Sequence, residues 1–276
     1  MAVVDYPRFA EKFENSGGSV TQTFPTRLYE WESSQDLRTP SASLTGAHYD
    51  LDLLGSVIGL KASARERLRF VISNLTVATI ETDFDTLKQK IYSIGQGKLY
   101  VINSAGSARR WAWARPTILP SSIIQVGQPR ILTVSALEFR RDSDWYDTTI
   151  TNEGEVLNAD PDTVVISNAG NAPVFNAIIT LKGTFTNPSI TSSTTGFSFS
   201  STRDGSAAAH WLKIDCGRGT VEFSTDSGAT YADDMPNFTR GASQVGFMRI
   251  DPGDNSWVIT GANGATLACD FYGAYH

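Results

Sequence analysis

Residues 164–173 of the chain read VVISNAGNAP, residues 175–183 read FNAIITLKG, and residues 248–259 read MRIDPGDNSWVI. In each stretch, β-branched and other apolar residues are bounded by Asn, Gly, Pro or Asp, which favour turns. The alternation of strand and turn continues to the C-terminus and predicts an all-β sandwich over residues 146–276. Such a domain is expected to bind or assemble, not to catalyse. The expected strands are 163–167, 174–182, 195–200, 210–216, 219–224, 246–250, 256–260 and 265–272.

The composition limits the class of protein. The chain has 276 residues, enough for one large or two ordinary domains, and 41% of them are hydrophobic, which suits a packed core. Its formal net charge of −6 argues against a nucleic-acid binder. No apolar run approaches the roughly 20 residues needed to cross a bilayer. Residues 1–8 lack the pattern of a secretory signal, so we expect synthesis in a cytoplasm.

The first half of the chain predicts a mixed architecture. Residues 1–45 are polar and rich in turn residues, and two interpretations stay open: an extended arm, or a partly ordered leader. Residues 46–140 predict a strand, a helix and three further strands, which is the order of an α+β domain with a split-barrel-like sheet. We place the linker to the second domain near residue 145. The expected strands are 67–72, 98–102, 109–115 and 130–139.

The helix has the clearest local signals in the chain. Thr82 followed by Asp85 fits a capping box, which predicts that the helix begins there. Phe84, Leu87 and Ile91 recur at helical spacing and predict a buried face. A glycine at position 95 then predicts the end of the helix.

Signals for a phosphate loop or a structural metal are weak. Gly95-Gln-Gly97-Lys98 lacks the spacing and the hydroxyl residue of a phosphate-binding loop, so we interpret it as a turn from helix to strand. Cys216 and Cys269 lie in strand-like stretches, which predicts two buried thiols, although a disulfide between them stays open. With the three histidines they show no metal-ligand spacing.

The carboxylates give no catalytic assignment. Asp233, Asp234, Asp251 and Asp254 could belong to a glycosidase pair or a calcium site, but Asp is also a common turn residue. The spacing of a calcium-binding loop is missing. We assign no catalytic, cofactor-binding or metal-binding residue, and we expect no cofactor and no enzymatic activity.

Two groups of aromatic residues could serve recognition. Trp211, Trp257, Tyr272 and Tyr275 fall on expected strands, where burial in the core is the commoner fate and an exposed sugar-binding platform is the alternative.

Residues 109–115 read RRWAWAR, with both tryptophans on one face of a strand. The mixture could bind nucleic acid, but alternation and the acidic net charge favour a half-buried strand or a subunit interface.

Six short motifs follow one another in the second half of the chain: Asn168-x-Gly170-x-x-Pro173, LKG at 181–183, NPSI at 187–190, WLKID at 211–215, DPGDN at 251–255 and FYGAY at 271–275. Taken in this order, they resemble the C-terminal domain of the distal tail proteins of long-tailed, siphovirus-type bacteriophages. The N-terminal half is similar to that family only in its order of elements.

The resemblance implies a structural role in a phage tail. It implies that residues 1–145 form a tail-tube-like ring, a homohexamer, that joins the tail tube to the tail tip and baseplate. It further implies that residues 146–276 form a galectin-like sandwich that anchors receptor-binding or hub proteins and, in some members, host glycans. DNA would be only passing cargo, and the virion would be the final location.

Two other functions stay open. A carbohydrate-binding module or lectin-like adhesion protein would use the same sandwich, and a glycan hydrolase would need two carboxylates across a cleft.

Overall fold

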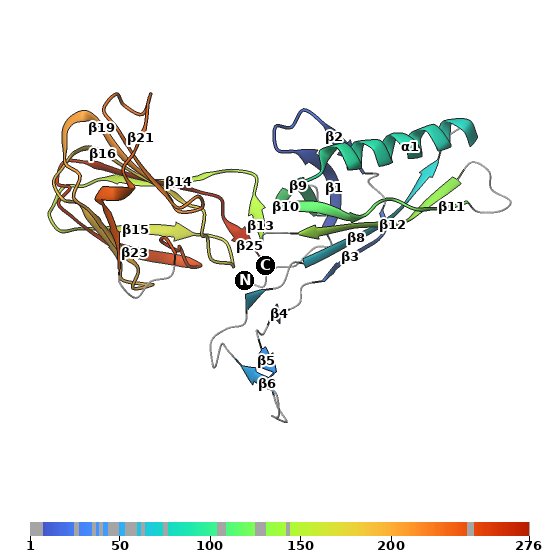
Figure 1. Cartoon of the computed structure of the whole chain (residues 1–276), viewed down its shortest axis with the longest axis horizontal. Helices are drawn as coiled ribbons and strands as arrows, with labels where there is room; N and C mark the ends of the chain where they lie inside the picture. Colours follow the sequence, from blue (N-terminus) through green and yellow to red (C-terminus); the bar gives the residue numbers. More distant parts are fainter. Residues whose placement is uncertain are drawn as a thin grey trace. The chain divides into compact units, whose positions relative to one another are not determined.

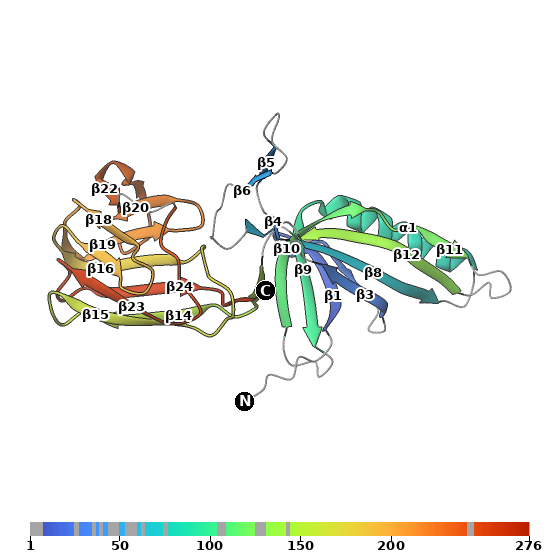
Figure 2. The same cartoon turned by 90° about the horizontal axis from the view of Figure 1, so that it is seen from below.

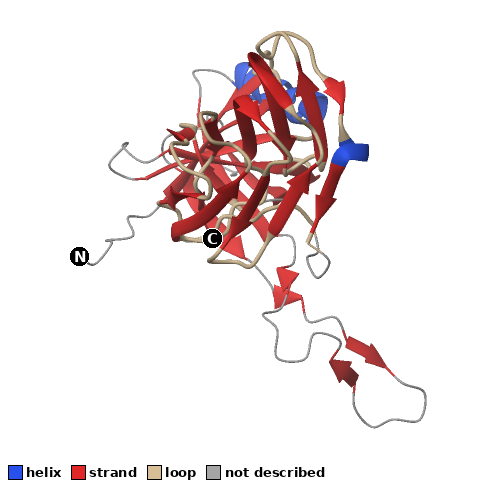
Figure 3. Ribbon diagram, turned by 90° about the vertical axis from the view of Figure 1, so that its left-hand side faces the viewer, coloured by secondary structure: helices blue, strands red, loops and turns tan. Residues whose placement is uncertain are grey.

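The computed structural model describes residues 8–24, 28–34, 37–38, 41–43, 50–52, 60–61, 64–73, 77–103, 109–124, 131–141, 144–241 and 246–275. The chain divides into two compact units, Met1–Asp144 and Trp145–His276. Strands make up most of the described residues of each unit (Figure 3). No helix among the described residues is long and apolar enough to span a membrane.

The first unit is built on one curled antiparallel sheet with the strand order β2-β1-β9-β10-β12-β8-β3 (Figure 2). The helix α1, Val77–Ile94, lies along one face of the sheet and contacts β1, β2 and β8 (Figure 1). The strands are β1 Arg8–Asn15, β2 Thr21–Thr23, β3 Leu28–Ser34, β8 Ala64–Ser73, β9 Gly97–Asn103, β10 Arg109–Ile118 and β12 Ile131–Arg141, with β11 Ser122–Ile124 beside β12.

The expectation of an arm or leader over residues 1–45 is wrong for much of that segment. β1 lies inside the sheet between β2 and β9, and β3 pairs with β8. Residues 37–61 add two small pairs, β4 Leu37–Arg38 with β7 Leu60–Lys61, and β5 Ser41–Ser43 with β6 Asp50–Asp52. Residues 1–7 lie outside the described residues.

The core of the first unit lies between the sheet and the helix. Phe13 and Phe139 are fully buried with ring centroids 4.7 Å apart. The same inner face carries a buried ion pair, in which Arg141 Nε donates to Glu66 Oε1 at 3.0 Å. Phe139 on β12 lies directly opposite Glu66 on β8. The aromatic packing and the ion pair therefore both depend on the same register of these two strands.

The predicted helical face is confirmed, but the predicted start is wrong. Phe84, Leu87 and Ile91 are buried together with Ile80 and Ile94. The helix begins five residues earlier than expected, at Val77, so Thr82 lies within it. Its hydroxyl donates to the Ala78 carbonyl 2.9 Å away instead of capping the helix.

The turn after the helix explains the two glycines that resemble a phosphate loop. Gly95 has φ +62°, the left-handed conformation that ends many helices. At Gly97 an added Cβ would lie 2.2 Å from the Glu14 carbonyl oxygen, so only glycine allows β9 to approach β1 this closely.

The second unit has two antiparallel sheets around one buried core, as predicted for a sandwich. One sheet has the order β14-β24-β16-β19-β20-β21 and the other β15-β23-β17-β18-β22. The strands are β14 Thr151–Val156, β15 Asp162–Asn168, β16 Ile178–Phe185, β17 Ser189–Ser192, β18 Ser198–Ser201, β19 Gly205–Asp215, β20 Thr220–Ser224, β21 Ala232–Asp233, β22 Phe238–Arg240, β23 Gly253–Thr260 and β24 Thr266–Phe271. A short 3-10 helix, Met235–Asn237, precedes β22.

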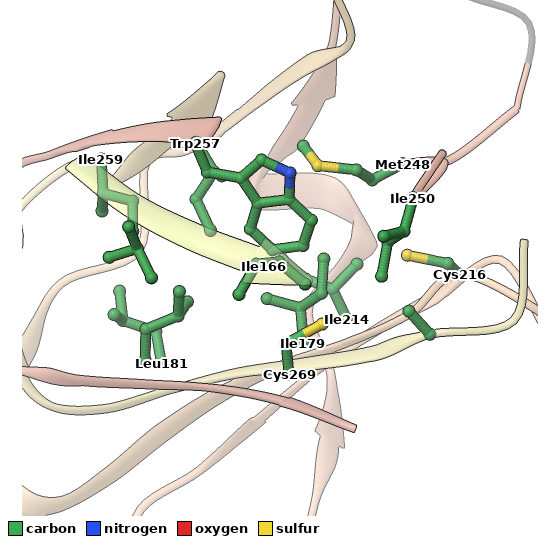
Figure 4. Close-up of a cluster of buried hydrophobic side chains, with 14 of the residues drawn as sticks. Ile166, Ile179, Leu181, Ile214, Cys216, Met248, Ile250, Trp257, Ile259 and Cys269 are labelled. Atoms are coloured by element: carbon green, nitrogen blue, oxygen red, sulfur yellow. The ribbon is translucent and has the colours of Figure 1, made fainter. Parts of the chain in front are cut away.

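Trp257 lies at the centre of this core and is fully buried among aliphatic side chains from both sheets (Figure 4). Cys216 and Cys269 are buried free thiols, so the prediction of small buried hydrophobes is confirmed. Burial raises the pKa of Cys216 to about 12 and also raises the pKa of Cys269.

Two of the strand predictions need correction. The expected strand 174–182 begins only at Ile178. Before it, Val174 forms an isolated bridge with Ile250 and does not belong to a strand. That bridge is also the only pairing within the expected strand 246–250. Four strands of the two sheets, β14, β17, β21 and β22, were not predicted. β14 is an edge strand with no fully buried residue, so its sequence shows no alternation of apolar and polar residues.

Candidate functional site

The candidate carboxylates have structural roles. Asp234 is fully buried, where it accepts hydrogen bonds from Arg203 Nε at 2.9 Å and from the Asn237 amide at 2.6 Å. Asp251 forms an ion pair with Arg249 at 2.7 Å. No group of three or more His, Cys, Asp or Glu side chains within the described ranges could hold a metal ion.

Three of the motifs that carry the resemblance, residues 168–173, 251–255 and 271–275, lie close together at one end of the second unit. The Asn168 side chain donates to the Ala172 carbonyl and accepts from the Gly170 amide, at 3.0 and 2.9 Å. Asn255 does the same for the 251–253 turn, where its amide group donates to two carbonyls and its oxygen accepts from the Asp251 amide. An added Cβ on Gly170 would lie 2.1 Å from the Ala274 carbonyl oxygen. These residues therefore shape turns and bring backbones close together.

The chain also enters and leaves the second unit at this end. β13, Trp145–Asp147, pairs with β25, Ala274–Tyr275. The Tyr275 hydroxyl donates to Asp147 Oδ2 at 3.0 Å, and the Ala172 amide donates to the Ala274 carbonyl. The first and last strands of the unit are thus neighbours.

The four candidate sugar-binding aromatics do not form an open platform. Trp257 lies in the core, and Tyr272 and Tyr275 are half-buried. The ring of Trp211 is covered by Lys182 Nζ, 4.6 Å from its centroid, and by the backbone at Gly228, where an added Cβ would lie 2.6 Å from the ring. The prediction of burial in the core is confirmed for Trp257. The ring of Trp211 is instead packed against Lys182 and Gly228.

The aromatic and basic strand at 109–115 is β10, and its tryptophans share a face as predicted. Trp111 and Trp113 make an edge contact with centroids 5.7 Å apart, and Lys98 Nζ lies 4.8 Å from the centroid of Trp111. Arg109 pairs with Glu11. Acidic side chains therefore accompany the cations on this sheet, which does not favour nucleic-acid binding.

The two units differ in charge. Residues 1–144 contain seventeen Lys and Arg against fifteen Asp and Glu, whereas residues 145–276 contain six against fourteen. The formal charges are therefore +2 and −8, so the acidic average comes from the second unit.

Two surfaces beside α1 in the first unit are candidates for assembly. The first, here called the Tyr92 patch, consists of Tyr92, Pro116 and Leu119. Tyr92 is 76% exposed and Leu119 45%, and an open pocket of about 420 Å³ lies among these three residues and Arg115. Exposed apolar groups that cluster in this way are typical of interaction sites.

The second surface, here called the helix groove, is an open hollow of about 420 Å³ between α1 and the strands β2 and β8. Phe24, Phe70 and Leu87 form its apolar floor, and Asp83, Thr86 and Lys90 line the helix side. Sequence reasoning missed both surfaces, because they depend on how α1 lies on the sheet.

The fold places the chain in a class of β-rich proteins with one helix on a curled sheet followed by a two-sheet unit. The solved crystal structure of SPP1 Dit (gp 19.1), described as a hub adsorption apparatus of phages that infect Gram-positive bacteria, has the same fold. The TM-score is 0.60 at 11% sequence identity, over 89% of this chain and 93% of that chain. The baseplate of phage p2 in its activated conformation also aligns, over 96% of this chain at 9% identity with a TM-score of 0.46. The sequence matches no family model and no curated protein.

Proposed function

We propose that this protein is a structural, non-enzymatic component of a bacteriophage tail. The observation that carries the proposal is the fold shared with SPP1 Dit, which extends over both units. The order of turn motifs in residues 168–255 supports it independently, because those motifs resemble the distal tail proteins in sequence. In this role the protein would be located in the virion.

The proposed mechanism is assembly. Residues 1–145 form a ring of identical subunits, a homohexamer, that connects the tail tube to the tail tip. Residues 146–276 act as a galectin-like sandwich that anchors tail-tip hub or receptor-binding proteins. Tail DNA passes through the ring without sequence-specific contact. Two exposed surfaces on the first unit support self-association, since a ring needs two different contact surfaces on every subunit.

The proposal is tested by imaging the purified full-length protein in negative stain and measuring its mass by light scattering. Rings with a central pore, and a mass that is a whole multiple of the 30.0 kDa chain, are the expected result. A monomer at every concentration up to that used for imaging would reject ring formation.

A carbohydrate-binding module or lectin-like adhesion protein is the alternative. The covered ring of Trp211 is evidence against an open platform there. Binding of the full-length protein to a glycan array, lost on Trp211→Ala, would favour this alternative.

A further inference from the structure

The strand β14 forms an open edge of the six-stranded sheet in the second unit. It pairs with β24 along all six of its residues, and within the described part of the chain no other strand pairs with it. None of its residues is fully buried. The backbone N–H and C=O groups on its free side can therefore pair with another extended chain, which is how many proteins bind a peptide at a sheet edge.

The side chains of β14 on the core side of the sheet are charged. Glu153 lies opposite Cys269 and Glu155 lies opposite Leu267, and both of these partners are fully buried. Neither carboxylate forms a hydrogen bond or an ion pair with any residue that the structure describes. Acidic residues directed inward on an edge strand disfavour pairing with an identical strand, because like charges would meet. A second copy of β14 is therefore a poor occupant of this edge.

The strands around this edge carry no basic residue. β14, β15, β23 and β24 contain five Asp and Glu and no Lys or Arg. Beyond β24 in the same sheet, β16 has one lysine, Lys182, whose ammonium group lies over the ring of Trp211. Arg249, shortly before β23, is paired with Asp251. The edge therefore favours a partner with positive charge.

We propose that β14 binds an extended segment of a partner protein in which Lys or Arg alternates with β-branched residues. The inference rests on the anchoring role proposed above and specifies the edge that anchors and the chemistry of the anchored segment. Two cations of that segment oppose Glu153 and Glu155, and its other face packs beside Val156, which is 51% exposed. Backbone hydrogen bonds supply the affinity, and the charges select the partner.

The test measures the binding of a fluorescent eight-residue peptide to the full-length protein by fluorescence anisotropy. In this peptide lysine alternates with threonine and valine. A second peptide has the same sequence with every backbone amide N-methylated, so it keeps the charge but has no backbone N–H to donate. The first peptide should bind, and the second should bind at least about tenfold more weakly.

Two double variants test the part played by the carboxylates. Glu153→Gln with Glu155→Gln should weaken binding of the first peptide about tenfold. Asp204→Asn with Asp233→Asn is the matched control, since it removes the same charge at exposed positions and Asp233 lies on β21, at the opposite edge of the sheet. Far-UV circular dichroism checks that both variants fold. In the wild type, the peptide should also slow hydrogen exchange of the amides in residues 151–156.

Three outcomes would overturn the proposed edge: no binding at peptide concentrations up to about 1 mM, equal affinity for the N-methylated peptide, or equal losses in the two double variants. The last two would show that net charge alone attracts the peptide. Light scattering of the same wild-type sample tests the ring separately. Rings that bind no peptide would reject only this contact, whereas a monomer that binds the peptide would reject only ring formation.

Discussion

Arg141→Met should strongly destabilise the first unit. The Arg141 and Glu66 side chains are 2% and 0% exposed, so the substitution leaves the Glu66 carboxylate buried without the guanidinium that faces it. Breaking a buried ion pair on one side costs about 3–5 kcal/mol, a large share of the roughly 5–15 kcal/mol that holds an ordinary domain together. With a urea dependence of about 2 kcal/mol/M, the unfolding midpoint should fall by about 2 M.

The assay is urea unfolding at one fixed protein concentration, followed by far-UV circular dichroism and tryptophan fluorescence, because association would also change the midpoint. Arg140→Met on the same strand is the control, since Arg140 is exposed and its loss should change stability by no more than about 0.5 kcal/mol. Glu66→Leu with Arg141→Met should recover most of the loss, because apolar residues can replace a buried pair. A midpoint for Arg141→Met within about 0.3 M of the wild type would refute the reasoning.

Three further predictions concern other parts of the molecule. Leu87→Asp places a carboxylate in the core beneath α1 and should abolish folding of the first unit or ring formation; unchanged oligomer size by light scattering would contradict this. Hydrogen bonds from the Thr230 hydroxyl and amide and from the Ser224 hydroxyl lower the pKa of Asp226 to about 2. The ionised carboxylate therefore stabilises the loop above about pH 4, and this stabilisation is lost as the pH falls through about 2. An NMR titration of the Asp226 carboxyl with a midpoint near about 4 would reject this prediction. Cys216 and Cys269 should resist thiol reagents at pH 8 in the native protein and react fully in urea, whereas rapid native labelling would show that the thiols are accessible.

The elements that could be predicted are those with a short-range sequence signal, such as a single buried face or a turn residue at each end. Phe84, Leu87 and Ile91 identified the helix because α1 buries a single stripe, and the Asn and Gly turns identified the two-sheet unit. β1 was missed because a bulge between Ala10 and Lys12 shifts its register and interrupts the alternation.

The candidate surfaces could not be predicted, for a related reason. Tyr92 is one exposed aromatic on a helix, and nothing in the sequence shows that Pro116 and Leu119, more than twenty residues later, lie beside it. Likewise, the helix groove combines Phe24, which directly follows β2, with Phe70 of β8. Sites of this kind arise from packing between distant segments and have no linear motif.

The pairing of β13 with β25 has a consequence for how the second unit can be reused. Its two chain ends meet at one place, where Trp145 lies opposite Tyr275. A unit with adjoining ends can be spliced into a surface loop of an unrelated protein, or have its ends joined and be reopened elsewhere, without stretching its sheets. Residues 145–275 therefore meet the geometric condition for insertion into another protein, because their two ends are adjacent.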